Sequence, residues 1–117
     1  MKPAKLAFKE TNLIDLGTKK IYQYPFKAKL ISVAKMSVKG RNPQGRNNFF
    51  LEHKCNFIIY IIKGTGKIYA GKETFKVGVG DCVYVPLENK FAVEGKLEYV
   101  TVDTPAFFPE QSEEIKV

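Results

Sequence analysis

The stretch from Gly64 to Pro86 constrains the fold of this chain more than any other. It reads GTGKIYAGKETFKVGVGDCVYVP, and apolar and polar residues alternate within its short runs, as they do in half-buried strands. Glycines separate the runs where a tight reversal needs a positive φ, and Pro86 ends the last run because it has no amide hydrogen for a neighbouring strand. The pattern predicts a hairpin, a turn at Gly80-Asp81 and a third strand.

The rest of the chain continues in the same style. Strand-like runs rich in β-branched and aromatic residues cover positions 30–38, 49–63 and 97–103. Positions 39–48, between the first two runs, are rich in Gly, Asn and Pro, which is typical of turns. Short strands separated by turn signals predict an antiparallel sandwich or barrel. We therefore expect an all-β protein.

The length and the composition fit a single domain. A chain of 117 residues, 44% of them hydrophobic, can bury a core without disulfides or structural metals. We expect one domain over residues 1–117, in which residues 1–28 supply short edge strands, residues 30–103 form the core barrel and residues 104–117 form a tail. The edge segment is rich in apolar side chains, and burying them across a twofold axis would produce a homodimer.

The charge of the chain narrows the choice of partners. The net charge is +7, but the lysines are spread over the whole length and only Arg41 and Arg46 are arginines. Proteins that read DNA sequence use arginine forks, and single-strand binders present aromatic stacking platforms. Because neither pattern is visible, we expect no nucleic-acid partner. The positive charge would instead attract a small ligand electrostatically if that ligand is anionic.

Nothing in the sequence indicates a membrane or an oxidising compartment. No apolar run approaches the roughly 20 residues of a membrane span, and the first ten residues lack the apolar centre of a signal peptide. The two cysteines, Cys55 and Cys82, do not form a CxxC or another recognised metal spacing. We therefore expect a cytoplasmic protein with reduced cysteines and no membrane contact.

The order of strands and glycines resembles that of a known family. A strand and a loop with Gly45 lead to a second strand and a glycine-rich hairpin, and Gly80-Asp81 then precedes Pro86 by a short strand. This order resembles the cupin superfamily over residues 31–109. The resemblance implies a double-stranded β-helix, also called a jelly-roll barrel, of the RmlC-like type.

Metal-binding cupins carry a His-x-His pair and a glutamate in a first motif and one more histidine in a second. In this chain the first histidine falls on Leu51 and the second on His53. The glutamate falls on Phe57 and the last histidine at or near Phe91. With the longer spacing of the motif, Glu52 takes the place of His53. Because leucine and phenylalanine offer no lone pairs, the resemblance implies a degenerate metal site, and we expect neither a metal nor another cofactor.

The same alignment defines the candidate ligand-binding residues. Leu51, His53, Cys55 and Phe57 alternate along one expected strand and would share one face of the barrel, and Phe91 joins them from the second motif. His53 is the single histidine of the chain. It is the candidate catalytic residue, because partial burial can bring an imidazole near neutral pH. His53 and Cys55 would supply two metal donors, so a metal site would need a third from elsewhere.

Functions from different classes remain open for such a site. The first is a metal-free cupin whose apolar pocket binds a small molecule, anionic or neutral, without turnover. The second is a metal-independent isomerase or epimerase of a sugar or keto compound, with His53 as the base and a tyrosine as the acid. A metal-dependent cupin oxygenase or isomerase is the third, which metal analysis would reveal. The sequence does not choose among four candidate tyrosines: Tyr60, Tyr69, Tyr84 and Tyr99.

Overall fold

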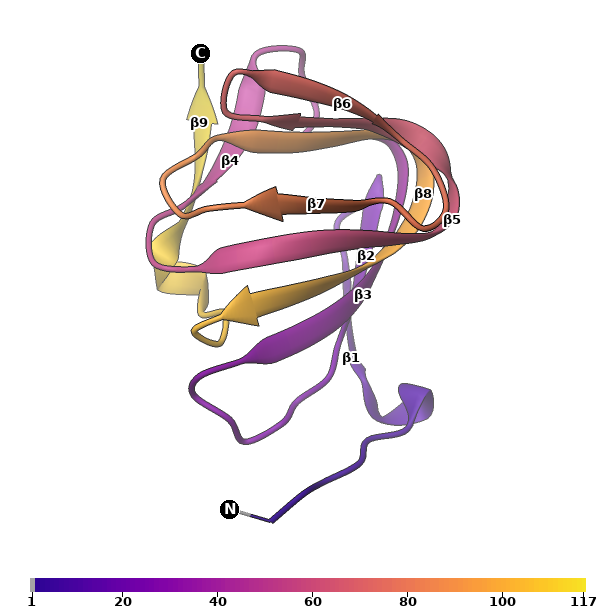
Figure 1. Ribbon diagram of the computed structural model, residues 1–117, viewed down its shortest axis with the longest axis vertical. Coiled ribbons are helices and arrows are strands. Elements are labelled where there is room, and N and C mark those ends of the chain that lie inside the picture. Colours follow the sequence, from indigo (N-terminus) through magenta and orange to yellow (C-terminus); the bar gives the residue numbers. More distant parts are fainter. Residues whose placement is uncertain (1) are drawn as a thin grey trace.

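The computed structural model describes residues 2–117. Within them nearly all of the regular structure is β-strand, and a nine-stranded sheet curls into a barrel (Figure 1). The strands are β1 (Asn12–Asp15), β2 (Lys19–Gln23), β3 (Ser32–Asn42), β4 (Asn48–Glu52), β5 (Asn56–Ala70), β6 (Glu73–Val77), β7 (Cys82–Val85), β8 (Phe91–Thr104) and β9 (Ser112–Lys116). Two single 3₁₀ turns accompany them, η1 (Phe8–Glu10) and η2 (Pro109–Gln111).

The two longest strands, β5 and β8, form the centre of the sheet. They pair antiparallel along nearly their whole length, from Asn56 opposite Thr104 to Ala70 opposite Phe91. β8 also pairs with β3, which continues to β2 and β1, and with β4, which continues to β9. β5 pairs in addition with β6 and β7. Both long strands bend strongly, and this curvature closes the barrel (Figure 1).

The segment from Gly64 to Pro86 contains the predicted hairpin and turn. β5 and β6 pair as a hairpin, with Gly71 in the reversal at a φ of +60°. Asp81 closes the next turn, because its Oδ2 accepts a hydrogen bond from the Gly78 N–H (2.8 Å). β7 ends at the residue before Pro86. The predicted fold class, an all-β jelly-roll barrel, is confirmed.

One boundary inside this segment differs from the sequence prediction. Gly64 and Gly66 lie within β5 and not in a reversal between two strands. At this point β5 crosses β8 so closely that a Cβ on either glycine would collide with a carbonyl oxygen, that of Lys96 or that of Glu94. Glycine is therefore needed here for the close approach of two backbones.

The hydrophobic core consists of side chains from the inner face of the curled sheet, chiefly those of β5, β7 and β8. Every second residue of β8 from Leu97 to Asp103 is buried, as expected for a strand with one inward face. Burial of a large aliphatic side chain contributes roughly 1.5–3 kcal/mol, so this packing holds the closed side of the barrel together. The most deeply buried large side chains are Ile59, Ile61, Ile68, Val38, Val85, Leu97 and Tyr99.

The N-terminal strands leave apolar surface uncovered. β1 lies at one end of the sheet, and Leu13, Ile14 and Leu16 are each about half exposed. Leu30 and Ile31 are exposed beside β3. This surface fits the expected homodimer, which stays a prediction, as does the cytoplasmic location. Within residues 2–117, no helix has the length and the apolar character that crossing a membrane requires.

Candidate functional site

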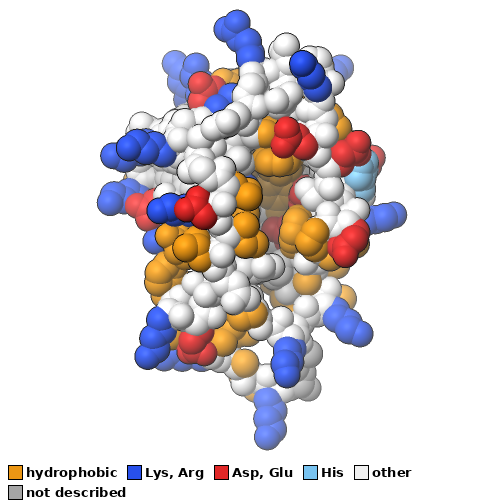
Figure 2. Space-filling model, turned by 180° about the vertical axis from the view of Figure 1, so that it is seen from behind, with side chains coloured by type: hydrophobic (Ala, Val, Ile, Leu, Met, Phe, Trp, Pro, Cys, Tyr) orange, Lys and Arg blue, Asp and Glu red, His pale blue; other side chains and the backbone are white. Residues whose placement is uncertain are grey.

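A cavity of about 380 Å³ lies inside the barrel. Strands β1 to β5, β8 and β9 contribute to its wall, together with residues that flank them. Figure 2 shows its opening, with hydrophobic side chains in its depth and acidic side chains beside it. The cavity is thus a mainly apolar pocket into which a few polar groups project. Its apolar lining consists of Ile14, Leu16, Ile21, Val33, Ala34, Met36, Phe50, Phe57, Ile59, Phe91, Tyr99, Phe107 and Pro109.

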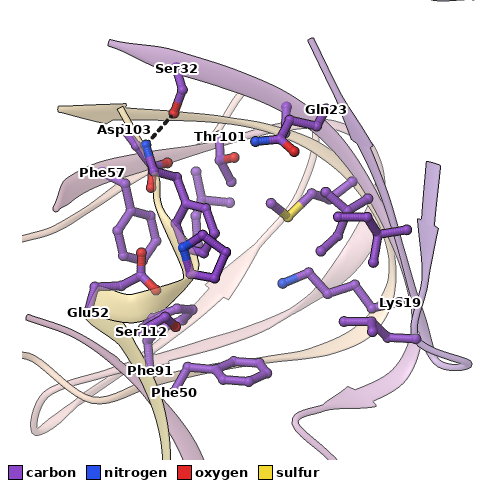
Figure 3. Close-up of a pocket in the computed structure, with 18 of the residues that line it drawn as sticks. Lys19, Gln23, Ser32, Phe50, Glu52, Phe57, Phe91, Thr101, Asp103 and Ser112 are labelled. Carbon is purple, nitrogen blue, oxygen red and sulfur yellow. Dashed lines mark hydrogen bonds between the residues drawn. The ribbon is translucent and has the colours of Figure 1, made fainter. Parts of the chain in front are cut away.

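Lys19, the first residue of β2, extends its side chain into this cavity (Figure 3). The residue is only 8% exposed, and its Nζ lies 5.4 Å from the centre of the Phe50 ring. The preceding turn fixes the start of β2, because the Leu16 N–H donates to the Lys19 carbonyl oxygen (2.8 Å). Burial lowers the pKa of Lys19 to about 8, and the charges of Glu52 and Asp103 offset part of this effect. The side chain can therefore exchange between ammonium and amine near neutral pH.

Asp103 enters the cavity from the opposite wall, close to the end of β8 (Figure 3). In the sheet it lies between Phe57 of β5 and Ser32 of β3, and it is 8% exposed. Burial and, to a smaller degree, the charge of Glu52 raise the pKa of Asp103 to about 7, against the opposing effect of Lys19. The carboxyl group is therefore protonated for much of the time at neutral pH.

Glu52, the last residue of β4, lies beside Asp103 and is 6% exposed. Its Oε1 accepts a hydrogen bond from Nε2 of Gln111 in η2 (3.1 Å). The Oε1 of the same glutamine accepts the backbone N–H groups of Lys54 (2.9 Å) and Cys55 (3.3 Å). The C-terminal segment thereby anchors both the carboxyl group of Glu52 and the bend that follows it.

Three potential metal-binding atoms, from Glu52, Cys55 and Asp103, lie within 4.8 Å of one another. The chemistry of this set does not fit a metal. The Cys55 thiol donates to the carbonyl oxygen of Pro105 (3.5 Å), and burial raises its pKa to about 11, whereas a metal is bound by the thiolate. Asp103 holds a proton near neutral pH, which also opposes coordination. We assign no metal to this cluster.

Phe57 and Phe91, two of the predicted ligand-binding residues, line the cavity. Their rings meet edge to face with centroids 4.7 Å apart, and the Phe50 ring lies 5.8 Å from that of Phe91. The three rings form a continuous aromatic wall that a flat apolar group could contact.

Three predicted ligand-binding residues lie outside the lining formed by residues 2–117: Leu51, His53 and Cys55. The expectation that they share an inward face is wrong. β4 ends at Glu52, and a bend at residues 53–55 precedes β5, so the alternation does not pass from one strand to the next. Phe50 and Glu52 face the cavity instead, which corresponds to the longer spacing of the motif.

His53 lies at the outer surface between two glutamates. Its Nδ1 is 2.6 Å from Oε1 of Glu88, in the loop after β7, and its Nε2 is 2.8 Å from Oε2 of Glu113 in β9. The hydrogen bonds to Glu113 and Glu88 raise the pKa of His53. Its role as a catalytic base stays a prediction, and this geometry leaves neither ring nitrogen free for a substrate.

Of the four candidate tyrosines, Tyr99 is the one whose side chain lines the cavity within residues 2–117. Tyr99 is 1% exposed, and burial raises the pKa of its hydroxyl group. Tyr60 and Tyr84 are exposed on the outside, and the Tyr69 hydroxyl donates to Oε1 of Glu94 (2.7 Å). A tyrosine and His53 are therefore not brought together in the cavity.

Sequence reasoning missed Lys19, Asp103 and Gln111, and it considered Glu52 only as an alternative. A signal for Asp103 is present, because residues 97–103 alternate and the aspartate falls on the same face as the buried Leu97, Tyr99 and Thr101. Nothing in the sequence separates Lys19 from the many exposed lysines. Gln111 lies two residues after Pro109 in the tail and gives no signal either.

Sequence comparison finds no family model that matches this chain and no matching curated protein. Solved structures do match it in three dimensions. A variant of Streptomyces PAC13 with uridine has a TM-score of 0.87 and is 19% identical, covering 98% of this chain and 92% of that one. A further matching structure is that of Pac13 as a unique nucleoside dehydratase.

Two further structures extend the comparison. Ectoine synthase from P. lautus has a TM-score of 0.76 and 17% identity over 97% of this chain and 90% of that one. An RmlC-like cupin from Shewanella frigidimarina has a TM-score of 0.72 and 17% identity over 90% of this chain and 93% of that one. At such identities the likeness concerns the fold, and the barrel type expected from the sequence is confirmed. The chain therefore has the barrel fold of these cupin structures.

Proposed function

We propose that the cavity binds an uncharged, hydroxyl-bearing molecule of about nucleoside size and performs acid–base chemistry on it. The supporting observation is a pair of buried groups on opposite walls: the pKa of Lys19 is lowered to about 8 and that of Asp103 is raised to about 7. Groups that titrate near the working pH can take up and release protons during turnover. In this proposal Lys19 is the base and Asp103 is the acid.

The reaction class that fits these groups best is the elimination of water. Lys19, as an amine, takes a proton from a carbon next to a carbonyl group. The electron pair of that C–H bond forms a C=C bond, the C–O bond of the hydroxyl group on the next carbon breaks, and Asp103 donates its proton to the departing oxygen. Return of the proton from Lys19 to Asp103 through solvent restores the site. The likeness in fold to a nucleoside dehydratase supports this class.

The lining suits a molecule with a flat ring and several hydroxyl groups. The aromatic wall of Phe50, Phe57 and Phe91 offers a stacking surface. A cavity of about 380 Å³ lies within the range of small-molecule sites, and a structural neighbour holds uridine. Uncharged polar side chains that could bind hydroxyl groups also line the cavity: Gln23, Ser32, Thr101 and Ser112.

The charges around the cavity favour an uncharged ligand. Lys19 is the one cationic side chain in the lining formed by residues 2–117. Four acidic side chains belong to the same lining: Glu52, Asp103, Glu113 and Glu114. The chain as a whole carries a net charge of +7, but its exposed lysines act from further away and through water. We therefore propose a neutral ligand in place of the anionic one that the overall charge suggests.

A binding protein without turnover is the second candidate, and the largely apolar lining favours it. Both candidates use the same cavity and neither requires a metal. They differ in what Lys19 and Asp103 do, because a binding site needs these groups only for contacts, whereas an elimination needs them to exchange protons.

The proposal is tested in two steps. Uridine is titrated into the purified protein by calorimetry, and nucleosides oxidised to β-hydroxy aldehydes or ketones are then incubated with it while mass spectrometry follows the loss of one water. We expect binding of uridine, and water loss with the wild type but not with Lys19→Met. Lys20→Met is the matched control, because Lys20 is the exposed neighbour in the same strand. Binding without any water loss would favour the second candidate, and absence of both would refute the proposal.

A further inference from the structure

Two buried carboxyl groups, those of Glu52 and Asp103, share one corner of the cavity, and the buried Gln111 donates a hydrogen bond to Glu52. We propose that Gln111 places the negative charge on Glu52 and leaves the shared proton on Asp103, which makes Gln111 the residue that positions the proton of the site. Only the description of Asp103 as the acid rests on the proposed function. The distribution of the charge between the two carboxyl groups can be measured without a substrate.

The orientation of the Gln111 amide is fixed by the backbone. Its Oε1 accepts hydrogen bonds from the N–H groups of Lys54 (2.9 Å) and Cys55 (3.3 Å), and its own carbonyl oxygen accepts one from His53 N–H (3.0 Å). A flipped amide would set its NH₂ group against two N–H donors. Because Gln111 is only 3% exposed, water cannot replace these partners easily. The NH₂ group therefore has to face Glu52.

This orientation makes the two carboxyl groups unequal. Glu52 accepts the Gln111 Nε2–H at 3.1 Å, and a donated hydrogen bond favours the charged form of a carboxyl group. Within residues 2–117 the Asp103 carboxyl group accepts no hydrogen bond of this kind. Oxygen atoms of the two groups lie within 4.8 Å of each other in a buried corner, so both cannot be charged without a large cost. The proton therefore stays on the group without a donor.

The surrounding ionisable groups support the same distribution. Lys19 on β2 attracts both carboxylates, and its interaction with Glu52 is the larger of the two. Cys55, before β5, is a neutral thiol that donates to a carbonyl oxygen. Glu113 and Glu114 of β9 line the same cavity and add negative potential, which disfavours a second charge in the corner.

The experiment is a ¹³C NMR titration of protein labelled at the carboxyl carbons of aspartate and glutamate. In the wild type, one aspartate resonance, assigned by its loss in Asp103→Asn, should titrate near pH 7. In Gln111→Glu the new carboxylate keeps an oxygen for the two backbone N–H groups but offers no hydrogen to Glu52. We expect the titration midpoint of one glutamate resonance to rise by at least about one pH unit in this variant, because the corner must bind another proton.

Glu52→Gln is the second variant, and it removes the charge while its amide oxygen still accepts the Gln111 hydrogen bond. The Asp103 titration should then shift down by about one pH unit or more. Gln44→Glu, in an exposed loop, controls for an added charge elsewhere and should change neither titration. If Gln111→Glu does not fold, as judged by circular dichroism, Glu52→Gln decides the matter alone.

The inference is overturned if Asp103 titrates at its ordinary acidic value in the wild type, or if Glu52→Gln leaves its titration in place. It is also overturned if a folded Gln111→Glu variant titrates like the wild type. Failure of the proposed function gives a different pattern, since the titrations would then follow the prediction while no water loss is seen with any β-hydroxy carbonyl compound.

Discussion

The protein contains two clusters of similar composition in opposite surroundings. Each places one basic side chain near two carboxyl groups: Lys19 with Glu52 and Asp103 inside the cavity, and His53 with Glu88 and Glu113 at the surface. In the cavity, burial lowers the pKa of the base and raises that of an acid, so both approach neutrality. At the surface, direct hydrogen bonds raise the pKa of the base. Burial thus brings the pKa values of Lys19 and Asp103 close to neutral pH, where both groups can exchange protons. At the hydrated surface, His53 stays hydrogen-bonded to the two glutamates.

The largest expected effect is a difference in turnover between variants of the two clusters. Lys19→Met removes the proposed base and should lower turnover by about 10²–10⁴-fold, the usual contribution of a general base. His53→Gln should change turnover less than about threefold, because the imidazole lies outside the cavity lining. Both are measured as rates of water loss from the β-hydroxy carbonyl substrates. If His53→Gln lowers turnover as much as Lys19→Met does, His53 and not Lys19 would be the better candidate for the base.

The pH dependence of turnover gives the next effect. The proposed reaction needs Lys19 as the amine and Asp103 as the protonated acid. The amine fraction of Lys19 increases up to about pH 8, whereas the protonated fraction of Asp103 decreases from about pH 7. The two limbs together give a bell with its maximum between pH 7 and 8, falling about tenfold per pH unit on either side. Rates measured from pH 5 to 10 test this shape. A single limb centred on the pKa of His53 would contradict it.

The stability of the fold should improve when the buried acid is removed. The pKa of Asp103 is about 7 in the folded chain and 3.8 in the ordinary case, so its contribution to stability declines as pH rises from about 4 to 7 and the cost is full above pH 7. Asp103→Asn should therefore raise the free energy of unfolding at pH 8 by about 1–3 kcal/mol and change it little at pH 4. Urea titrations at the two pH values provide the measurement. Equal changes at both would show that Asp103 is charged throughout.

The surface cluster should show the opposite pH trend with a smaller amplitude. The pKa of His53 is raised above 6.5 in the folded chain, so its stabilising contribution is present below pH 6.5 and is lost as pH rises through the raised value. His53→Gln should lower the melting temperature at pH 5.5 and leave it nearly unchanged at pH 9, as seen by differential scanning calorimetry. A loss that is larger at pH 9 would mean that the histidine acts through packing.

The smallest effect expected is that of metal removal. The buried cluster contains a neutral thiol and a protonated carboxyl group, so dialysis against a chelator should leave turnover and uridine binding within experimental error of the untreated protein. Elemental analysis before and after dialysis accompanies the assay. The prediction is contradicted if activity is lost when a stoichiometric metal is removed and returns when that metal is added back. Such a result would place a metal among Glu52, Cys55 and Asp103.

The fold was predictable from local patterns, and the site only in part. Glycines and alternating residues between Gly64 and Pro86 determine strands and turns within a short stretch, which is why the barrel was expected correctly. Phe57 and Phe91 belong to β5 and β8, and the family spacing placed both in the cavity correctly. His53 could not be placed correctly, because a bend at residues 53–55 interrupts the alternation on which the prediction depended.

Lys19 and Gln111 were beyond sequence reasoning for a different reason. They come from opposite ends of the chain and come near Glu52 only when the sheet closes. A lysine in a strand is normally an exposed residue, and only tertiary burial distinguishes this one from the others. Asp103 alone had a usable local signal, as the last inward position of an alternating strand.

The central claim, that burial brings the Lys19–Asp103 pair close to neutrality, is tested most directly on the lysine. Protein with ¹³Cε-labelled lysine is titrated by NMR from pH 6 to 11 in the absence of any ligand. The account predicts one lysine resonance that titrates near pH 8, well below the ordinary lysine value of 10.5, disappears in Lys19→Met and moves in Glu52→Gln. Titration of Lys19 near the ordinary value of 10.5 would contradict it, because the proposed base would then stay an ammonium at neutral pH.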